Sequence, residues 1–278
     1  MSEEDPAGMN IKSCLMSIAK LKNCPYKGMG KFDGHEILFF EGCDAALFTL
    51  KRMHIHAENI DREIKADNLI FATTHSSAKK IHSLSVHTIG NWGNAEMGGR
   101  PRQICPVNPG LTNDLFLTLH EEWSGETESG WQNDYQVTLE ATHHGPYVET
   151  PTAFIEIGST IEQWSDRKAG RIIAKTILRV ISGNGSLKGR EAPLAFGIGG
   201  THYCSNFNKR VLKGEVLLSH VCPKYALANF DENMLAQCME RTTQRPAFAF
   251  LDWKGLGSEK SRIVNLLQEQ GVEIRRTR

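Results

Sequence analysis

The sequence predicts an α/β fold: a single three-layer domain, residues 1–278, in which helices cover a mixed, mostly parallel sheet. Short apolar runs bounded by turn residues alternate with segments of helical periodicity along the chain. Hydrophobic residues make up 40% and charged residues 23% of the 278 positions, which is typical of a globular protein with a sizeable core. Alternating strands and helices favour a sheet covered on both faces.

Eight apolar segments are predicted to be strands, at residues 36–40, 69–73, 84–89, 137–141, 153–157, 194–198, 216–221 and 247–252. Five segments have the apolar spacing of helices, at residues 10–21, 111–123, 161–181, 231–241 and 259–270. Ser159 and Glu162 can form a capping box for the third helix, and Gly271 can end the last one. Two long stretches without periodicity, 90–109 and 182–193, are predicted to be binding loops or lids.

The seven cysteines are widely spaced and form no C-x-x-C pair, which excludes a thiolate zinc ribbon and disfavours a disulfide framework. No run of about 18 apolar residues occurs, and the acidic residues 1–5 lack the apolar core of a secretory signal. We therefore expect a cytoplasmic protein that does not associate with a membrane.

The formal net charge of zero conceals an asymmetry along the chain. Residues 1–139 carry a net charge of −5, and residues 140–278 carry +5. Within residues 167–213 there are ten basic side chains and one acidic side chain. A localised basic segment is typical of a surface that binds phosphates, whatever the total charge.

Four basic residues recur every four positions on the predicted helix 161–181 and form a ridge along one side: Arg167, Arg171, Lys175 and Arg179. Two interpretations stay open, a solvated helix face or a ridge that contacts nucleic-acid phosphates. The second is favoured by the basic residues that follow: Lys188, Arg190, Lys209, Arg210 and Lys213.

Several of the eleven histidines stand at or just after the ends of predicted strands: His75, His87, His143, His144, His202 and His220. Ligands of open α/β sheets bind in the crevice at the carboxyl ends of the strands. We therefore expect these imidazoles to converge in one crevice at that edge of the sheet.

Three carboxylates belong to the same set of segments. Glu140 lies near the end of one predicted strand, and Asp252 is the last residue of the predicted strand 247–252. Glu156 interrupts an apolar run, where a lone carboxylate needs a partner. Imidazole and carboxylate groups are zinc ligands, and zinc can activate water as a nucleophile. The alternative is that these histidines are structural, since no compact metal motif such as H-E-x-x-H occurs and adjacent His143 and His144 would point apart in an extended chain.

A glycine-rich turn, which includes Gly197, Gly199, Gly200 and Thr201, follows the strand 194–198. It lacks both the G-x-x-x-x-G-K-[ST] and the G-x-G-x-x-G pattern, so a standard nucleotide fingerprint is excluded. Its backbone can still approach a ligand, and we expect it to offer N–H groups to an oxyanion or to a terminal nucleotide.

Several of these motifs together resemble the archaeal and plant type of D-aminoacyl-tRNA deacylase. The matching segments are 7–11 (AGMNI), 61–64 (DREI), 75–77 (HSS), 87–93 (HTIGNWG), 140–146 (EATHHGP), 154–160 (FIEIGST), 197–203 (GIGGTHY) and 252–255 (DWKG). The resemblance covers almost the whole chain. One departure is that the apolar strand which usually precedes the first motif is missing here, or the start codon is set too late; loss of that strand would leave backbone groups of neighbouring strands exposed.

The resemblance implies an esterase that hydrolyses D-aminoacyl-tRNA to free tRNA and a D-amino acid, with broad specificity for the D-amino acid. It implies two zinc ions per chain and an α/β fold related to peptidyl-tRNA hydrolase and nucleoside phosphorylase. On this basis we predict a zinc-activated water held by His75, His87, His143 and His202, with Glu140, Glu156 and His144 as catalytic groups. We further predict a monomer that binds the tRNA acceptor end through the six residues Arg167, Arg171, Lys175, Lys209, Arg210 and Lys213.

Two rival functions remain. One is a peptidyl-tRNA hydrolase-like or small-molecule esterase on the same scaffold, which would cleave D- and L-aminoacyl esters equally well. The other is a non-catalytic tRNA- or nucleotide-binding protein whose histidines are structural and which would hold no metal.

Overall fold

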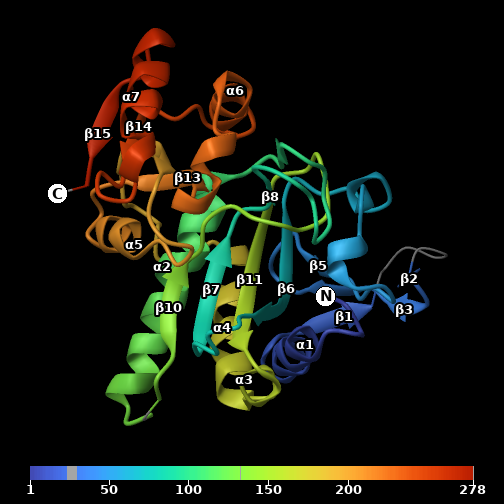
Figure 1. The fold of residues 1–278 in the computed structure, drawn as a ribbon. Coiled ribbons are helices and arrows are strands. Elements are labelled where there is room, and N and C mark those ends of the chain that lie inside the picture. The colour runs from blue at the N-terminus through green and yellow to red at the C-terminus, as the bar shows by residue number, and fades with distance from the viewer. Residues whose placement is uncertain (24–29, 132, 278) are drawn as a thin grey trace.

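The computed structural model describes residues 1–23, 30–131 and 133–277 (Figure 1). Two four-stranded sheets form its centre, with strand orders β10-β7-β11-β6 and β13-β12-β14-β15. Every pairing within these two sheets is parallel except that of β7 with β11. The structure confirms the predicted α/β class with mixed, mostly parallel sheets.

The strands of the first sheet are β6 (Leu69–Ser76), β7 (Ser83–His87), β10 (Gln136–Leu139) and β11 (Thr152–Ser159). Those of the second sheet are β12 (Leu194–Ile198), β13 (Leu217–Cys222), β14 (Phe248–Leu251) and β15 (Ile274–Arg276). Seven of these eight coincide with predicted strands, and β15 was not predicted. The predicted strand 36–40 is divided between β3 (His35–Glu36) and β4 (Leu38–Phe40), which belong to small antiparallel sheets with β1 (Leu21–Asn23), β2 (Lys31–Phe32) and β5 (Ala46–Leu47).

The main helices are α1 (Pro6–Ile18), α2 (Pro109–Glu128), α4 (Arg167–Ile181), α5 (Ser205–Leu212), α6 (Glu232–Glu240) and α7 (Lys260–Glu269). The predicted helix 161–181 is wrong as one element, because a short helix α3 (Ile161–Trp164) precedes α4. The Asp166 carboxylate accepts hydrogen bonds from the N–H groups of Lys168 and Ala169 and starts α4, whereas Ser159 still belongs to β11. The helix predicted at 10–21 begins earlier, because Asp5 caps its first turn and Pro6 occupies the first helical position.

The two faces of the first sheet differ in character. Ala153, Ile155 and Ile157 of β11 point into the main apolar core, which α1, α2 and α4 complete on one side. Figure 1 shows α2 and α4 behind this sheet. The alternating positions, among them Glu156, point to the opposite face, so the period of two in a strand separates an apolar face from a polar one.

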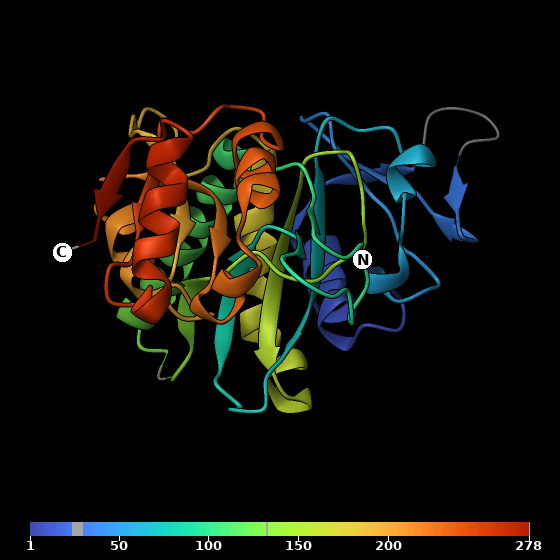
Figure 2. The same cartoon turned by 45° about the horizontal axis from the view of Figure 1, so that its top comes forward.

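The second sheet is apolar on both faces. Ala195 on one face packs in the same core as Phe207 and Val211 of α5, and Phe196 on the other face packs with residues of α6 and α7. Figure 2 shows these last two helices (orange and red) in front of the second sheet. Helices on both faces of this sheet form the three predicted layers.

The two predicted loops are tied down rather than open. The stretch 90–109 contains a two-stranded ladder of β8 (Gly90–Asn91) and β9 (Gln103–Ile104), and the Glu58 carboxylate accepts a hydrogen bond of 2.6 Å from the N–H of Gly99. In the stretch 182–193, the N–H groups of Ser186 and Leu187 bond to side chains of α2. Both segments are therefore anchored to neighbouring parts of the fold in this structure.

Residues before α1 run beside residues 48–50: Ser2 forms a parallel bridge with Leu50, the N–H of Glu3 donates to the carbonyl of Leu50, and the N-terminal ammonium donates to the carbonyl of Phe48. The β6 strand, against which α1 packs, is an outer strand of the first sheet. In the described ranges, no helix has the length and hydropathy needed to cross a bilayer.

Candidate active site

Glu156 lies at the centre of a buried polar cluster on the face of the first sheet opposite the main core. It pairs in register with Thr73 of β6 and Ser85 of β7, and its side chain is fully buried. The Thr73 hydroxyl donates a hydrogen bond of 2.7 Å to its Oε1. Its Oε2 lies 3.4 Å from Nδ1 of His75 and 3.5 Å from Nε2 of His87. A single carboxylate oxygen therefore stands between imidazoles from two different strands.

Glu140, just beyond the end of β10, provides the second carboxylate and is 2% exposed. Its Oε2 lies 3.4 Å from Nδ1 of His75, 3.1 Å from Nε2 of His202 and 3.6 Å from Nε2 of His143. His75 thus contacts both carboxylates. The two acids and four imidazoles form one continuous network.

The outer edge of β10 explains how His202 reaches this network. The N–H of Leu139 donates to Oδ1 of Asn208 in α5, and the N–H of Ala141 donates to the carbonyl of His202. The segment 202–208 therefore runs along β10 and satisfies backbone groups that an edge strand leaves unpaired. This pairing places the His202 ring over Glu140.

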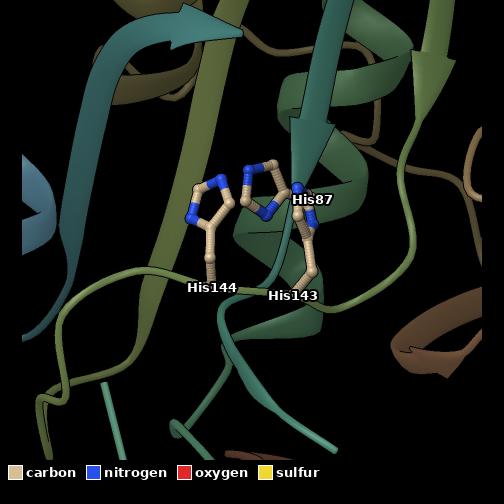
Figure 3. A group of neighbouring side chains, drawn as sticks. All are labelled: His87, His143 and His144. Atoms are coloured by element: carbon tan, nitrogen blue, oxygen red, sulfur yellow. The ribbon is translucent and has the colours of Figure 1, made fainter. Parts of the chain in front are cut away.

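His143 and His144 both face the cluster although they are adjacent in sequence (Figure 3). Their ring centroids are 4.2 Å apart, and those of His87 and His143 are also 4.2 Å apart. His144 has φ +27° and Gly145 has φ +97°, so the chain bends in the left-handed region instead of remaining extended. Adjacent side chains of an extended chain point to opposite sides, but this bend lets both rings face the same cluster.

The cluster does not lie at one carboxyl edge of a sheet, and that expectation was wrong. Because β11 is parallel to β6 but antiparallel to β7, the carboxyl ends of β6 and β7 lie at opposite edges. His75 is level with Gly158 and His87 is level with Phe154, so the two rings approach Glu156 from both sides. The imidazoles meet on the face of the sheet.

Burial and charge act against each other in this cluster. Burial opposes protonation of His75, but its hydrogen bond to Glu156 and the charges of both carboxylates raise its pKa to about 8. Burial likewise opposes ionisation of Glu156, but the charge of His87 and hydrogen bonds from His75 and His87 hold its pKa well below the usual range. The imidazole partners outweigh burial, and the pKa of Glu140 is lowered in the same way, so both carboxylates are ionised at neutral pH.

In two further imidazoles of the cluster, those of His143 and His144, the pKa is lowered. Burial and then the charge of His87 lower the pKa of His144 to about 3 and that of His143 well below its usual range. The Nδ1 of His143 lies 2.8 Å from the carbonyl of Ala141, which only accepts, so this nitrogen is the donor. Its Nε2 therefore carries a lone pair directed toward Glu140.

These residues fit a divalent cation of the zinc type. Three overlapping groups bring their nitrogen and oxygen atoms within 4.8 Å of one another: His87, His143, His144; His75, Glu140, His202; and His87, Glu140, Glu156. Within the described ranges, several buried atoms of these groups lack a hydrogen bond of normal geometry: both oxygens of Glu140, Oε2 of Glu156, Nε2 of His87 and Nδ1 of His144. Such atoms are costly to bury unless a ligand satisfies them, and N and O donors in groups of three suit zinc.

The other candidate residues near strand ends lie outside this cluster. Nε2 of His220 bonds to the carbonyl of Arg241, and the Asp252 carboxylate accepts from Asn206 and from the N–H of Gly255. Both are structural contacts.

The glycine turn packs against the Asp252–Gly255 loop. Gly199 and Gly200 have φ +92° and +83°, and a Cβ on Gly200 would lie 3.0 Å from Oδ2 of Asp252. The N–H of Gly199 donates to the carbonyl of Cys222. That N–H is engaged within the fold, so an oxyanion role would fall to the turn's other N–H groups, those of Gly200 and Thr201, which stays a prediction; Gly197 lies within β12.

The predicted phosphate-binding residues are divided between two places. On α4, Lys175 lies 2.8 Å from Glu126 and Arg179 lies 2.9 Å from Glu122, both carboxylates of α2, whereas Arg167 and Arg171 are exposed. This helix lies on the core side of the first sheet, away from the buried cluster. The other three predicted residues lie in α5 or directly after it: Lys209, Arg210 and Lys213.

Sequence reasoning missed four side chains near the site or the α5 surface. The hydroxyls of Tyr203 and Tyr225 lie 3.2 Å from His75 and His202, respectively. Arg275 and Arg276 of β15 line a groove of about 370 Å³ together with Arg210. The tyrosine of the GIGGTHY motif was a signal for Tyr203, whereas the others stand in no motif.

An α/β scaffold that buries two ionised carboxylates among five imidazoles has the acid–base and cation-binding groups of a hydrolase. A family model for D-aminoacyl-tRNA deacylase matches residues 62–275. The chain therefore belongs to the D-aminoacyl-tRNA deacylase family, a family of ester hydrolases.

Individual relatives agree over nearly the full length. A Pyrococcus furiosus protein described as D-aminoacyl-tRNA deacylase is 34% identical over 97% of this chain and 96% of its own. One from Methanosarcina mazei with the same description is 33% identical over 98% of this chain and 89% of its own. A crystal structure of a conserved protein of unknown function superposes with a TM-score of 0.84 at 29% identity, covering 99% of this chain and 93% of that one.

Proposed function

We propose that this protein hydrolyses the ester between a D-amino acid and the terminal ribose of tRNA, with broad specificity for the amino acid. The observation that carries the proposal is the buried Glu140–Glu156 pair surrounded by five imidazoles, in a chain of this family. A cluster of two carboxylates and five imidazoles is expensive to bury even when its members contact one another, so chemistry is the better reason for its presence.

The residues that would hold zinc are His87, His143 and His144 in one group and His75, Glu140 and His202 in another, with Glu156 between them. Two groups of ligands agree with the two zinc ions that the family resemblance implies. Zinc supplies Lewis acidity, which polarises an ester carbonyl and makes water a stronger acid. The carbonyls of Thr88 and Ala141, which accept from Nδ1 of His87 and His143, orient both rings with Nε2 toward the cluster.

The protein's own groups supply the proton transfers. A neutral imidazole or an ionised carboxylate at the cluster takes a proton from water as its oxygen attacks the ester carbonyl carbon. The bond between that carbon and the ribose oxygen then breaks, and the ribose oxygen takes up a proton. We assign this acid–base work to Glu156, which lies between the two zinc-holding groups; Glu140 and His144, the other two predicted catalytic residues, can take part only where they do not hold zinc.

Phosphate contacts are expected on the α5 side of the site. The helix starts at Ser205, directly after His202 and Tyr203, and carries Lys209 on its exposed surface. A nucleic acid whose end enters the cluster can therefore continue along α5. Activity on charged tRNA would place the protein in the cytoplasm.

The decisive experiment measures deacylation of D-Tyr-tRNA and L-Tyr-tRNA before and after chelation, with zinc added back. We expect release of D-tyrosine alone, loss of activity with chelator and recovery with zinc. Equal cleavage of both enantiomers would favour a less selective esterase, and no cleavage of either would favour a tRNA-binding protein. Chelator-resistant cleavage of D-Tyr-tRNA would remove zinc from the proposal but keep the deacylase assignment.

A further inference from the structure

We propose that Tyr225 is the stacking platform for the terminal nucleobase of the tRNA. This inference rests on the proposed function and adds a recognition site for the single-stranded end of the substrate. Tyr225 lies on a 3₁₀ helix, Lys224–Asn229, that follows β13.

The ring of Tyr225 is unusually open to solvent. Its exposed fraction is 61%. Among the Phe, Trp and Tyr side chains in the described part of the chain, it is the one that is largely exposed. Single-stranded nucleic acids are bound by aromatic faces on which bases stack, and stacking tolerates any base because each has a π face. An exposed ring beside a catalytic cluster is suited to this role.

The ring is also held in place before a ligand arrives. Its hydroxyl lies 3.2 Å from Nδ1 of His202, whose Nε2 lies 3.1 Å from Glu140. The backbone below it is anchored, because Ala226 and Leu227 are buried in the second apolar core and the N–H of Lys224 donates to the carbonyl of Gly200. A rigid aromatic loses little conformational freedom on binding, which favours affinity.

The position of Tyr225 near the cluster indicates which nucleobase would stack on it. The ester is carried by the ribose of the last nucleotide, so the base of that nucleotide must lie close to the cluster when the carbonyl does. Tyr225 is one imidazole ring away from Glu140, through His202. The exposed ammonium of the adjacent Lys224 is available to the terminal phosphate.

The proposal is tested by pairing a change in the protein with a change in the RNA. Equilibrium binding of uncharged tRNA, with and without its 3′-terminal adenosine, is measured for the wild type and for Tyr225→Ala. We expect the wild type to prefer intact tRNA by roughly tenfold or more, as expected for a stacked base, and Tyr225→Ala to lose this preference. Ile161→Ala, a change at another exposed apolar side chain, is the control and should keep the preference.

Tyr225→Phe separates the ring from the hydroxyl. It keeps the aromatic face and loses the contact with His202, so its preference for intact tRNA should match the wild type. The ratio of kcat/KM between Tyr225→Phe and Tyr225→Ala should be about tenfold on D-Tyr-tRNA and near one on D-tyrosine ethyl ester, which has no base.

The inference is overturned if Tyr225→Ala weakens both tRNA forms equally, or if Tyr225→Phe loses the preference for the intact end. A wild type that discriminates the terminal adenosine but does not cleave D-Tyr-tRNA would refute the proposed function and leave the stacking site standing.

Discussion

Two neighbouring residues of β11 show how differently the two faces of the first sheet are used. Ile155 and Glu156 are both fully buried, but Ile155 packs into the main core with α1, α2 and α4, whereas Glu156 contacts His75 and His87. Burial of an apolar side chain stabilises the fold by about 1.5–3 kcal/mol. Burial of an ionised carboxylate costs free energy that its partners must offset. One face of this sheet thus packs against the main core, and the other carries the buried polar cluster for which we propose the chemistry.

The largest effect is expected from Glu156→Gln. This change keeps the shape of the side chain but removes the negative charge between His75 and His87. We expect kcat/KM for D-Tyr-tRNA to fall by about 10²-fold or more, since acid–base groups contribute 10²–10⁴-fold. Ile155→Val, on the opposite face, is the matched control and should retain most of the activity. Undiminished turnover by Glu156→Gln would contradict the proposed role of Glu156 in the reaction.

The reciprocal change, Ile155→Ala, should act on stability. Removal of three buried carbon atoms from a packed core costs about 2–5 kcal/mol of the free energy of unfolding. Urea unfolding measures this loss, and kcat of the folded fraction should stay within a few-fold of the wild type. A variant that is stable but inactive would show that the apolar face also positions the reacting groups.

The same contrast explains which parts of the molecule could be predicted from sequence. Seven strands were predicted because apolar runs are a local signal, and Glu156 stood out because a carboxylate interrupts such a run. Strand direction has no local signal, so the antiparallel pairing of β7 with β11, and with it the position of the cluster on the sheet face, was not foreseen. Tyr225 was missed because an exposed aromatic residue matters only beside a site that tertiary structure creates.

The helix predictions show a similar limit. Helix α5 has eight residues with Phe207 and Val211 on its buried side, a pattern too short to distinguish from a loop. The acidic partners of the α4 ridge, such as Glu122 and Glu126, are about 50 residues away in sequence. Sequence spacing locates a row of charges, but only packing decides whether other charges neutralise it.

His220 is a buried imidazole outside the cluster, so its effect on stability can be measured apart from any effect on the reaction. Burial lowers the pKa of His220 from 6.5 to about 4, so the folded protein binds fewer protons than the unfolded chain between these values. Its contribution to stability is fully present above pH 6.5 and is lost as the pH falls toward 4. From pH 7 to pH 5 the loss should be about 2 kcal/mol. Urea unfolding of His220→Gln should lack this part of the pH dependence, and an unchanged dependence would contradict the assignment.

The smallest effects concern the two basic surfaces. Arg275→Ala with Arg276→Ala removes two guanidinium groups from the groove shared with Arg210, whereas Arg167→Ala with Arg171→Ala removes two exposed charges from α4, on the core side of the sheet. Each lost phosphate contact should reduce the slope of log K against log salt by about 1. We expect a reduced slope for the first pair in tRNA binding and little change for the second. Because Arg275 and Arg276 lie on β15 at the edge of the second sheet, an equal effect of both pairs would mean that tRNA contacts both this edge and α4.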